Sequence, residues 1–281
     1  MSRKIDVSLI TAKVAELFAR ANTELRPDVL EALRELYEKE SIPNAKSMLG
    51  VLVENAGMAG KEKIAICQDT GISVVFLEIG MDVRLSGGSL KEAVDRGVEK
   101  AYSDNFFRMS VVPDPVLREN TGGNTPAVVH TDIVEGDGIA ITVMPKGFGS
   151  ENKGKIAMMN PTSRPEDIVA FCVGAVRDAG PDACPPYALG IGVGGTMETC
   201  ALAAKKALLR PVSSVNPAPH LARLEKEIKQ KTNSLGIGVM GLGGGSTVMG
   251  VCVEALPTHI AGLPVAVNVS CHALRSASGE I

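Results

Sequence analysis

The chain has 281 residues and a mass of 29.3 kDa, which is long enough to bury a substantial core in one large domain or two small ones. Hydrophobic residues make up 45% of it, but aromatic residues only 3%, and Trp is absent, so base-stacking platforms for nucleic acid are excluded. A net charge of -3 and a pI near 5.9 exclude a general basic field for nucleic acid or anionic membranes. An anionic small molecule stays compatible, because a few arginines in a cleft act locally.

The beginning of the chain carries positive charge but no long apolar segment. Elsewhere, no segment reaches the roughly 18 uninterrupted apolar residues of a membrane-spanning helix. We therefore expect a cytoplasmic protein without a cleaved leader.

The N-terminal residues 1–60 have the spacing of helices. Apolar residues recur at helical intervals from Val7 to Phe18, and a second apolar stripe follows Pro27. A third helix is expected after Pro43, ending near Gly57 or Gly60. These segments are predicted to be packing helices.

The rest of the chain mixes strands and helices without a regular βαβ repeat. The hydrophobic pattern predicts strands over residues 72–79, 127–134, 138–144, 246–255 and 263–270. It predicts helices over residues 90–102, 166–178, 197–208 and 221–233. The order predicts a mixed α/β (α+β) class, with the helical N-terminal part packed on mixed or antiparallel sheets. We expect a single large domain over residues 1–281, with its site at the ends of loops.

The 30 glycines gather in a few loops. Two of these, GIGVGGT and GLGGGS, resemble nucleotide-binding loops at first sight. However, the pattern GxxxxGK[ST] is absent, and no dinucleotide fingerprint has its acidic residue at the expected distance after a strand. We therefore expect turns between buried strands, or loops whose backbone N–H groups approach a ligand.

The six cysteines are widely scattered and include no CxxC pair, which favours free thiols, metal ligands or catalytic groups over disulfides. Cys67, Cys184 and Cys271 each stand at the edge of an apolar run, and two prolines stiffen the loop after Cys184. The other three stand inside apolar runs and are expected to be small buried hydrophobes: Cys172, Cys200 and Cys252. Three thiolates from distant segments would hold zinc with an open position, or a 4Fe–4S cluster with one free iron. Plain buried cysteines are the alternative.

Two charged residues are candidates for a site. Asp69 lies in the stretch AICQDTGIS, so a metal held by Cys67 would be within reach of both Gln68 and Asp69. Alternatively, Asp69 shapes the turn before Gly71. Arg108 follows a Phe-Phe pair, where its planar fork would bind a carboxylate, unless it simply extends along the surface.

The histidines are less informative. His259 stands between two prolines in an apolar neighbourhood and is either a turn residue or a site residue. His130 and His220 are interpreted as structural, whereas His272, next to Cys271, fits either role.

The motifs ICQDTG, NTGGNTPA, KGFGSENK, CPPY and SCHALR follow one another between about Asn55 and Arg275. In this order they resemble the α part of the iron-sulfur fumarate hydratase and tartrate dehydratase family. The resemblance implies a 4Fe–4S cluster held by Cys67, Cys184 and Cys271, with one iron not ligated by protein. It implies catalysis by Asp69 and substrate contacts from Gln68, Asp69, Arg108, the Gly149 backbone, His259 and Arg275.

The resemblance further implies a hydro-lyase that hydrates fumarate reversibly to (S)-malate. The nearest alternative is dehydration of L(+)-tartrate to oxaloacetate, and a non-catalytic iron-sulfur redox protein fits less well. Family members need a second, β-type region to complete the active site. Because the sequence stops six residues after Arg275, we expect a separate β subunit, a heterotetramer of two α and two β chains, and little or no activity from this chain alone.

Overall fold

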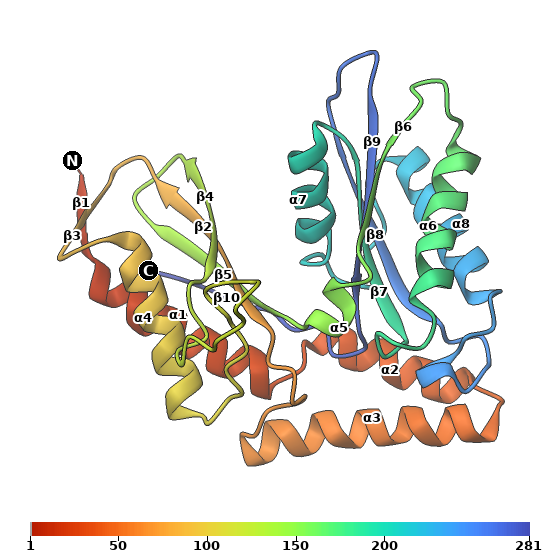
Figure 1. Cartoon of the computed structure of the whole chain (residues 1–281), viewed down its shortest axis with the longest axis horizontal. Helices are drawn as coiled ribbons and strands as arrows, with labels where there is room; N and C mark the ends of the chain where they lie inside the picture. The colour runs from red at the N-terminus through yellow and green to blue at the C-terminus, as the bar shows by residue number, and fades with distance from the viewer. Residues whose placement is uncertain (1) are drawn as a thin grey trace. The chain divides into compact units, whose positions relative to one another are not determined.

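The computed structural model describes residues 2–281, which form two compact units (Figure 1). Unit 1 comprises the chain up to Arg26, Ala56–Phe148 and Arg275–Ile281, and unit 2 comprises Pro27–Asn55 and Gly149–Leu274. The mixed α/β (α+β) class is confirmed. That residues 1–281 act as one catalytic domain stays a prediction.

Unit 1 is built around a four-stranded sheet with the strand order β10-β5-β2-β4. Its elements are β1 (Arg3–Asp6), α1 (Val7–Thr23), β2 (Ile72–Gly80), β3 (Val83–Ser86), α4 (Leu90–Asp104), β4 (Val128–Val134), β5 (Ile139–Lys146) and β10 (Ala277–Glu280). β2 and β4 pair in parallel, whereas β5 is antiparallel to both β2 and β10. β1 and β3 form a separate parallel pair.

The helices of unit 1 begin where their sequence offers caps. Asp6 accepts a hydrogen bond from the Ser8 N–H at 2.9 Å and so caps α1, and Ser89 caps α4. The apolar stripe of α1, predicted from its spacing, is buried against α4 and the strands β5 and β10. Since helix and sheet bury one another's apolar faces, this contact forms the core of unit 1.

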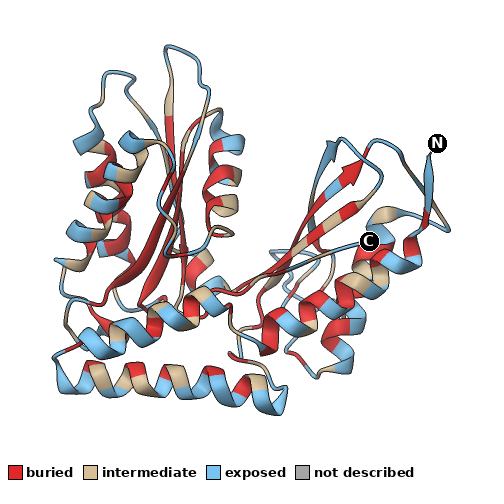
Figure 2. Ribbon diagram, turned by 180° about the vertical axis from the view of Figure 1, so that it is seen from behind, coloured by how far each residue is buried: buried red, intermediate tan, exposed pale blue. Residues whose placement is uncertain are grey.

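Unit 2 is built around a second four-stranded sheet with the order β6-β9-β7-β8. Its elements are α2 (Pro27–Lys39), β6 (Lys155–Met159), α6 (Pro165–Ala179), β7 (Tyr187–Gly194), α7 (Met197–Ala207), α8 (Pro219–Asn233), the 3-10 helix η1 (Val239–Gly241), β8 (Val248–Leu256) and β9 (Leu263–Ser270). In Figure 1, α7 covers one face of this sheet and α6 and α8 cover the other. Figure 2 shows the enclosed strands to be largely buried, which explains their continuous apolar runs.

Two glycines of the GIGVGG stretch explain how α7 packs so closely. A Cβ atom on Gly190 would lie 2.0 Å from the carbonyl oxygen of Ala204, and one on Gly192 would lie 2.1 Å from that of Cys200. Both carbonyl oxygens belong to the backbone of α7. These glycines therefore serve helix-on-sheet packing, consistent with the missing nucleotide-loop pattern.

Two helices contain residues of both units, α3 (Pro43–Glu62) and α5 (Phe148–Glu151). The longer helices and strands expected from the sequence are confirmed, whereas six short elements were not predicted: β1, β3, α5, β6, η1 and β10. Among residues 2–281, no helix combines the length and the apolarity needed to cross a bilayer.

Candidate active site

The ICQDTG motif forms an irregular loop between α3 and β2 in unit 1. Ile66 is buried, Cys67 and Asp69 are half-buried, and Gln68 is exposed. The loop is fixed at its start by a hydrogen bond of 2.9 Å from the Ile66 N–H to the carbonyl oxygen of Asn22 in α1. The polar break between two apolar runs is therefore an ordered segment whose side chains are partly accessible.

Three consecutive carbonyl oxygens of this loop accept hydrogen bonds from buried side chains. The pairs are Arg275 Nη2 to Asp69 O at 2.7 Å, Tyr102 Oη to Thr70 O at 2.7 Å and Asn124 Nδ2 to Gly71 O at 3.1 Å. The donors come from three separate segments of unit 1. Loop geometry is thus set by tertiary contacts, in place of a regular secondary structure.

The Asp69 carboxylate is engaged at both oxygens. Its Oδ1 accepts from the Gly71 N–H at 3.1 Å, and its Oδ2 accepts from the Phe148 N–H at 2.8 Å. Phe148 is the first residue of α5, so Asp69 caps that short helix as well as shaping its own turn. Space at Gly147 is tight, because a Cβ atom would lie 3.0 Å from Asp69 Oδ2.

Arg108 is linked to the loop through its backbone. Its carbonyl oxygen accepts a hydrogen bond of 2.5 Å from Thr70 Oγ1. The Arg108 side chain is exposed and makes no hydrogen bond or ion pair within residues 2–281. Its guanidinium group is therefore available for a ligand carboxylate.

Arg275 differs from Arg108 in its surroundings. It is only 2% exposed, and its Nη1 donates to Asn22 Oδ1 at 3.1 Å while its Nη2 donates to Asp69 O. Its Nε is buried and has no hydrogen-bond partner in the part of the chain that the structure describes. Arg275 therefore contacts the loop from inside unit 1.

In unit 2, Cys184 and Cys271 come from loops that touch. The backbone N–H of His272 donates to the carbonyl oxygen of Cys184 at 3.2 Å, and His272 Nδ1 lies 3.2 Å from the same oxygen. Burial raises the pKa of Tyr187, and its electrostatic interactions with Cys184, Asp182 and Cys271 act in the same direction. Both sulfurs thus lie within electrostatic reach of one tyrosine.

Cys184 also has an unusual backbone conformation. Its φ of 57° lies in the left-handed region, which costs a residue with a Cβ about 1–2 kcal/mol. The side chain is exposed, and Cys271 is half-buried. Strain at an accessible thiol is typical of residues kept for function.

The remaining cysteines differ in environment, as the sequence predicted. Cys172 and Cys200 are 0% exposed, and Cys252 is 3% exposed. Burial raises the pKa of Cys172 to about 12 and that of Cys200 to about 11, so both thiols stay protonated and inert near neutral pH. The three accessible cysteines are those in the motifs.

Gly149 and Glu151 belong to the short helix α5. Gly149 is exposed, and a Cβ atom there would meet nothing within 4 Å, so its backbone is open to a ligand. Glu151 pairs with Lys205 of α7 and accepts from Asn268 Nδ2 at 3.2 Å. These contacts tie the KGFGSENK motif to the sheet of unit 2.

His259 lies in the exposed connection between β8 and β9, where its Nδ1 accepts from the Ala261 N–H at 3.2 Å. His130 stacks on Phe76 with ring centroids 5.2 Å apart, and His220 is near the start of α8. Their structural interpretation is consistent with these positions.

Within residues 2–281, no three His, Cys, Asp or Glu side chains gather into a ready-made metal site. Cys67 belongs to unit 1, whereas Cys184 and Cys271 belong to unit 2. By chemistry alone, the three accessible thiols are donors of the kind that an iron-sulfur cluster takes, whereas the other three thiols are buried in the core.

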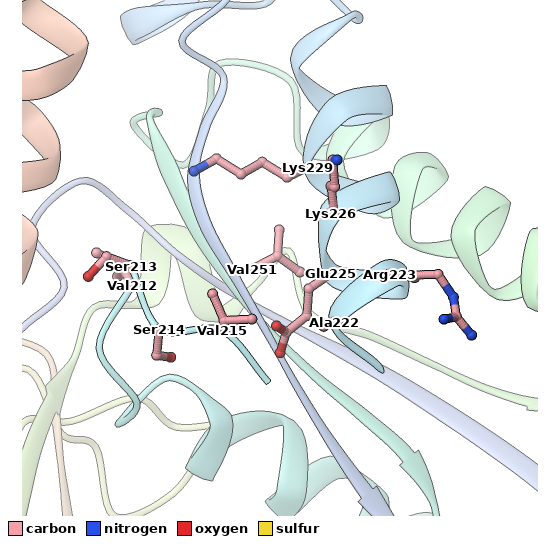
Figure 3. A pocket seen from close by; sticks show the side chains of 10 residues that line it. All are labelled: Val212, Ser213, Ser214, Val215, Ala222, Arg223, Glu225, Lys226, Lys229 and Val251. Carbon is pink, nitrogen blue, oxygen red and sulfur yellow. The ribbon is translucent and has the colours of Figure 1, made fainter. Parts of the chain in front are cut away.

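A cavity of about 430 Å³ in unit 2 lies apart from these residues, between residues 212–215 and α8 (Figure 3). Two of its charged groups are already engaged: Lys229 donates to Met249 O at 2.5 Å, and Glu225 pairs with Arg210 at 2.9 Å. Arg223 points away from the other lining residues in Figure 3. None of the predicted site residues lines this cavity.

Sequence reasoning missed Asn22, Tyr102 and Asn124 as supports of the loop. Tyr102 and Asn22 stand in ordinary helical segments, and nothing local marks them. Asn124 lies in the motif NTGGNTPA, and its φ of 56° marks it as special only in the structure.

Comparison with known proteins gives concordant similarities. The family model described as fumarate hydratase (Fumerase) matches residues 11–280. A protein of Methanocaldococcus jannaschii named putative L(+)-tartrate dehydratase subunit alpha is 40% identical over 278 residues, covering 97% of each chain. The L(+)-tartrate dehydratase subunit alpha of Escherichia coli strain K12 is 32% identical over 272 residues, covering 96% of this chain and 89% of its own.

Proposed function

Because the chain belongs to the fumarate hydratase (Fumerase) family of hydro-lyases, we propose that it is the α subunit of an enzyme that adds water to a C4 dicarboxylate. The first candidate reaction is the reversible hydration of fumarate to (S)-malate. The observation that carries this proposal is the family match over residues 11–280, together with three accessible cysteines within its motifs.

We assign the cluster ligands to Cys67, Cys184 and Cys271. The separation of accessible and buried thiols supports this choice, as does the contact between the loops of Cys184 and Cys271. When bound, a 4Fe–4S cluster with one iron free of protein ligands supplies a Lewis acid that polarises a hydroxyl and a carboxylate.

The other site residues bind and orient the substrate. The exposed guanidinium of Arg108 presents a planar fork for the distal carboxylate. The Gln68 amide, the Gly149 backbone N–H and the exposed His259 offer further polar contacts. Asp69 takes or returns the proton at the substrate carbon, and its hydrogen bonds to Gly71 and Phe148 hold the carboxylate in place.

The active enzyme requires a separate β subunit in this proposal. The relatives are named subunit alpha, and the alignments with them cover 96–97% of this chain. We propose a heterotetramer of two α and two β chains, and a cytoplasmic location follows from the sequence as a prediction.

Dehydration of L(+)-tartrate to oxaloacetate is the second candidate. It is favoured by a specific observation, because the relatives in Methanocaldococcus jannaschii and Escherichia coli are named tartrate dehydratase. Both substrates carry two carboxylates and would use the same arginine and the same cluster.

The decisive experiment is anaerobic co-expression with the β subunit, followed by assays with fumarate, malate and L(+)-tartrate. We expect iron-sulfur absorbance and hydro-lyase turnover, with higher kcat/KM for the true substrate. Changing Cys67, Cys184 and Cys271 together to Ser should abolish both, whereas Cys252→Ser, at a buried thiol, should retain them. Absorbance that survives the triple change would exclude these ligands.

A further inference from the structure

We infer that Asn22 and Arg275 act together as positioning residues that fix the backbone on both sides of Cys67. This inference gives them a functional meaning only if the loop belongs to the hydro-lyase site proposed above. Neither residue needs to touch the substrate for this role.

Asn22 holds the start of the loop. It lies in the last turn of α1 and is 0% exposed, and its backbone carbonyl oxygen accepts a hydrogen bond from the Ile66 N–H, one residue before Cys67. Its side-chain amide is oriented by two partners, since Nδ2 donates to Phe18 O at 3.1 Å and Oδ1 accepts from Arg275. Only this orientation points the NH2 group of the amide at a carbonyl oxygen and its oxygen at a guanidinium.

Arg275 holds the end of the same segment. Its Nη1 donates to Asn22 Oδ1, and its Nη2 donates to the carbonyl oxygen of Asp69, two residues after Cys67. The three residues from Cys67 to Asp69 are therefore bracketed by contacts that both lead back to Asn22. A loop held at both ends loses fewer conformations when its side chains engage a ligand.

The environment of Arg275 argues against a direct contact with substrate. The side chain is 2% exposed, and both of its Nη groups are engaged with neutral acceptors of unit 1. A buried cation without an ion pair in the described residues is costly. Two apolar residues would therefore serve a merely structural contact better than Arg275 and Asn22 do. We therefore assign Arg275 a positioning role in place of the substrate contact that the resemblance implied.

Close packing around the contacts of Asn22 and Arg275 supports a rigid backbone near Cys67. A Cβ atom on Gly147 would lie 3.0 Å from Asp69 Oδ2 and 3.8 Å from Arg275 Nη2. Tyr102 is 0% exposed, and its hydroxyl bonds to the next carbonyl, that of Thr70. The backbone between Cys67 and Thr70 has little room to shift unless these contacts open.

The test uses the full-length α chain without a cluster and measures the alkylation rate of Cys67 by iodoacetamide, resolved by mass spectrometry. The exposed Cys184 in unit 2 serves as an internal reference. Asn22→Leu removes the acceptor for Arg275, and Arg275→Lys keeps the charge but cannot reach both acceptors. We expect Cys67 to react about fivefold faster in both variants, with Cys184 unchanged, because one lost hydrogen bond favours local opening by about that factor.

Two matched variants complete the design. Arg20→Ala removes a hydrogen bond of 2.7 Å from the same helix to Ser278 O and should leave the Cys67 rate unchanged. Asn22→Asp keeps an acceptor for Arg275, so its Cys67 alkylation rate should stay within twofold of the wild-type rate. This comparison can be made even if Asn22→Leu does not fold. A wild-type rate in Arg275→Lys, a fivefold rise in Asn22→Asp or Arg20→Ala, or an equal rise at Cys184 would overturn the inference. Because the readout needs neither cluster nor substrate, its failure is distinct from failure of the proposed function.

Discussion

The carboxylate of Asp69 accepts a hydrogen bond from the backbone N–H of Phe148 at 2.8 Å, so the residue proposed as catalytic base also caps α5. The two alternatives that the sequence left open for Asp69, a turn residue and a site residue, are therefore compatible. The same hydrogen bond orients the carboxylate and stabilises the helix that carries Gly149.

This dual role predicts different effects of two substitutions at Asp69. Asp69→Asn keeps an oxygen acceptor for the Phe148 N–H but loses the one for the Gly71 N–H, and it removes the base, so kcat of the α–β complex should fall by about 10²- to 10⁴-fold with a smaller loss of stability than in Asp69→Ala. Asp69→Ala should lose activity and also about 0.5–2 kcal/mol of stability with the cap. Steady-state kinetics and thermal unfolding separate the two effects. Full activity in Asp69→Asn would exclude the base role.

Arg108 provides a second prediction, because its guanidinium is exposed and makes no hydrogen bond or ion pair within residues 2–281. Arg108→Lys should raise KM for the dicarboxylate by about 10- to 100-fold, since a point charge replaces a two-point fork. Arg118→Ala is the matched control. That residue lies in the same segment, and within residues 2–281 the sole hydrogen bond of its side chain is to Pro115 O at 3.5 Å, so its loss should leave KM unchanged. Equal effects of both variants would argue for general electrostatics and against a clamp.

The sequence predicted the long elements and the three accessible cysteines because both depend on local pattern. Helical and strand periods mark α1 and β2, and a position at the end of an apolar run marks Cys67. The support of the loop was not predictable in the same way. Asn22 and Arg275 are 253 positions apart, and their contact exists only after unit 1 has assembled from separate segments. No local pattern encodes such a pair.

Close packing of α7 on β7 supplies a third prediction. Gly190→Ala would place its Cβ 2.0 Å from Ala204 O, and backbone atoms of a helix cannot move apart without disturbing the sheet contact. We expect a loss of about 1–3 kcal/mol or more in the free energy of unfolding. Gly174→Ala, in α6, is the control, because its Cβ would meet nothing within 4 Å. That variant should gain about 0.5–1 kcal/mol from helix propensity. Equal stability changes would contradict the packing role of Gly190.

The pH dependence of stability should depend in part on Glu40 in unit 2. Burial acts to raise the pKa of this carboxyl, but the hydrogen bonds from the Ile42 N–H, from Ser246 Oγ at 2.8 Å and from the Ser41 N–H, together with the charge of Lys46, outweigh it and lower the pKa below its usual 4.5. A carboxyl with a lowered folded-state pKa contributes stability that is fully present above its unfolded-state pKa. This contribution is lost as the pH falls through the lower, folded-state value.

Glu40→Gln should therefore destabilise the chain by about 1–2 kcal/mol at pH 7, because neutral hydrogen bonds replace charge-assisted ones. The difference from the wild type should shrink as the pH falls below about 4.5, where the carboxyl of the unfolded chain becomes protonated, and it should be lost once the pH has passed the lower folded-state pKa. Urea unfolding of both proteins at pH 7, 5 and 3.5 measures this convergence. A difference that stays constant down to pH 3.5 would mean that the loss comes from packing around Ser246 and Gly244, since a Cβ on that glycine would lie 2.8 Å from Glu40 Oε2.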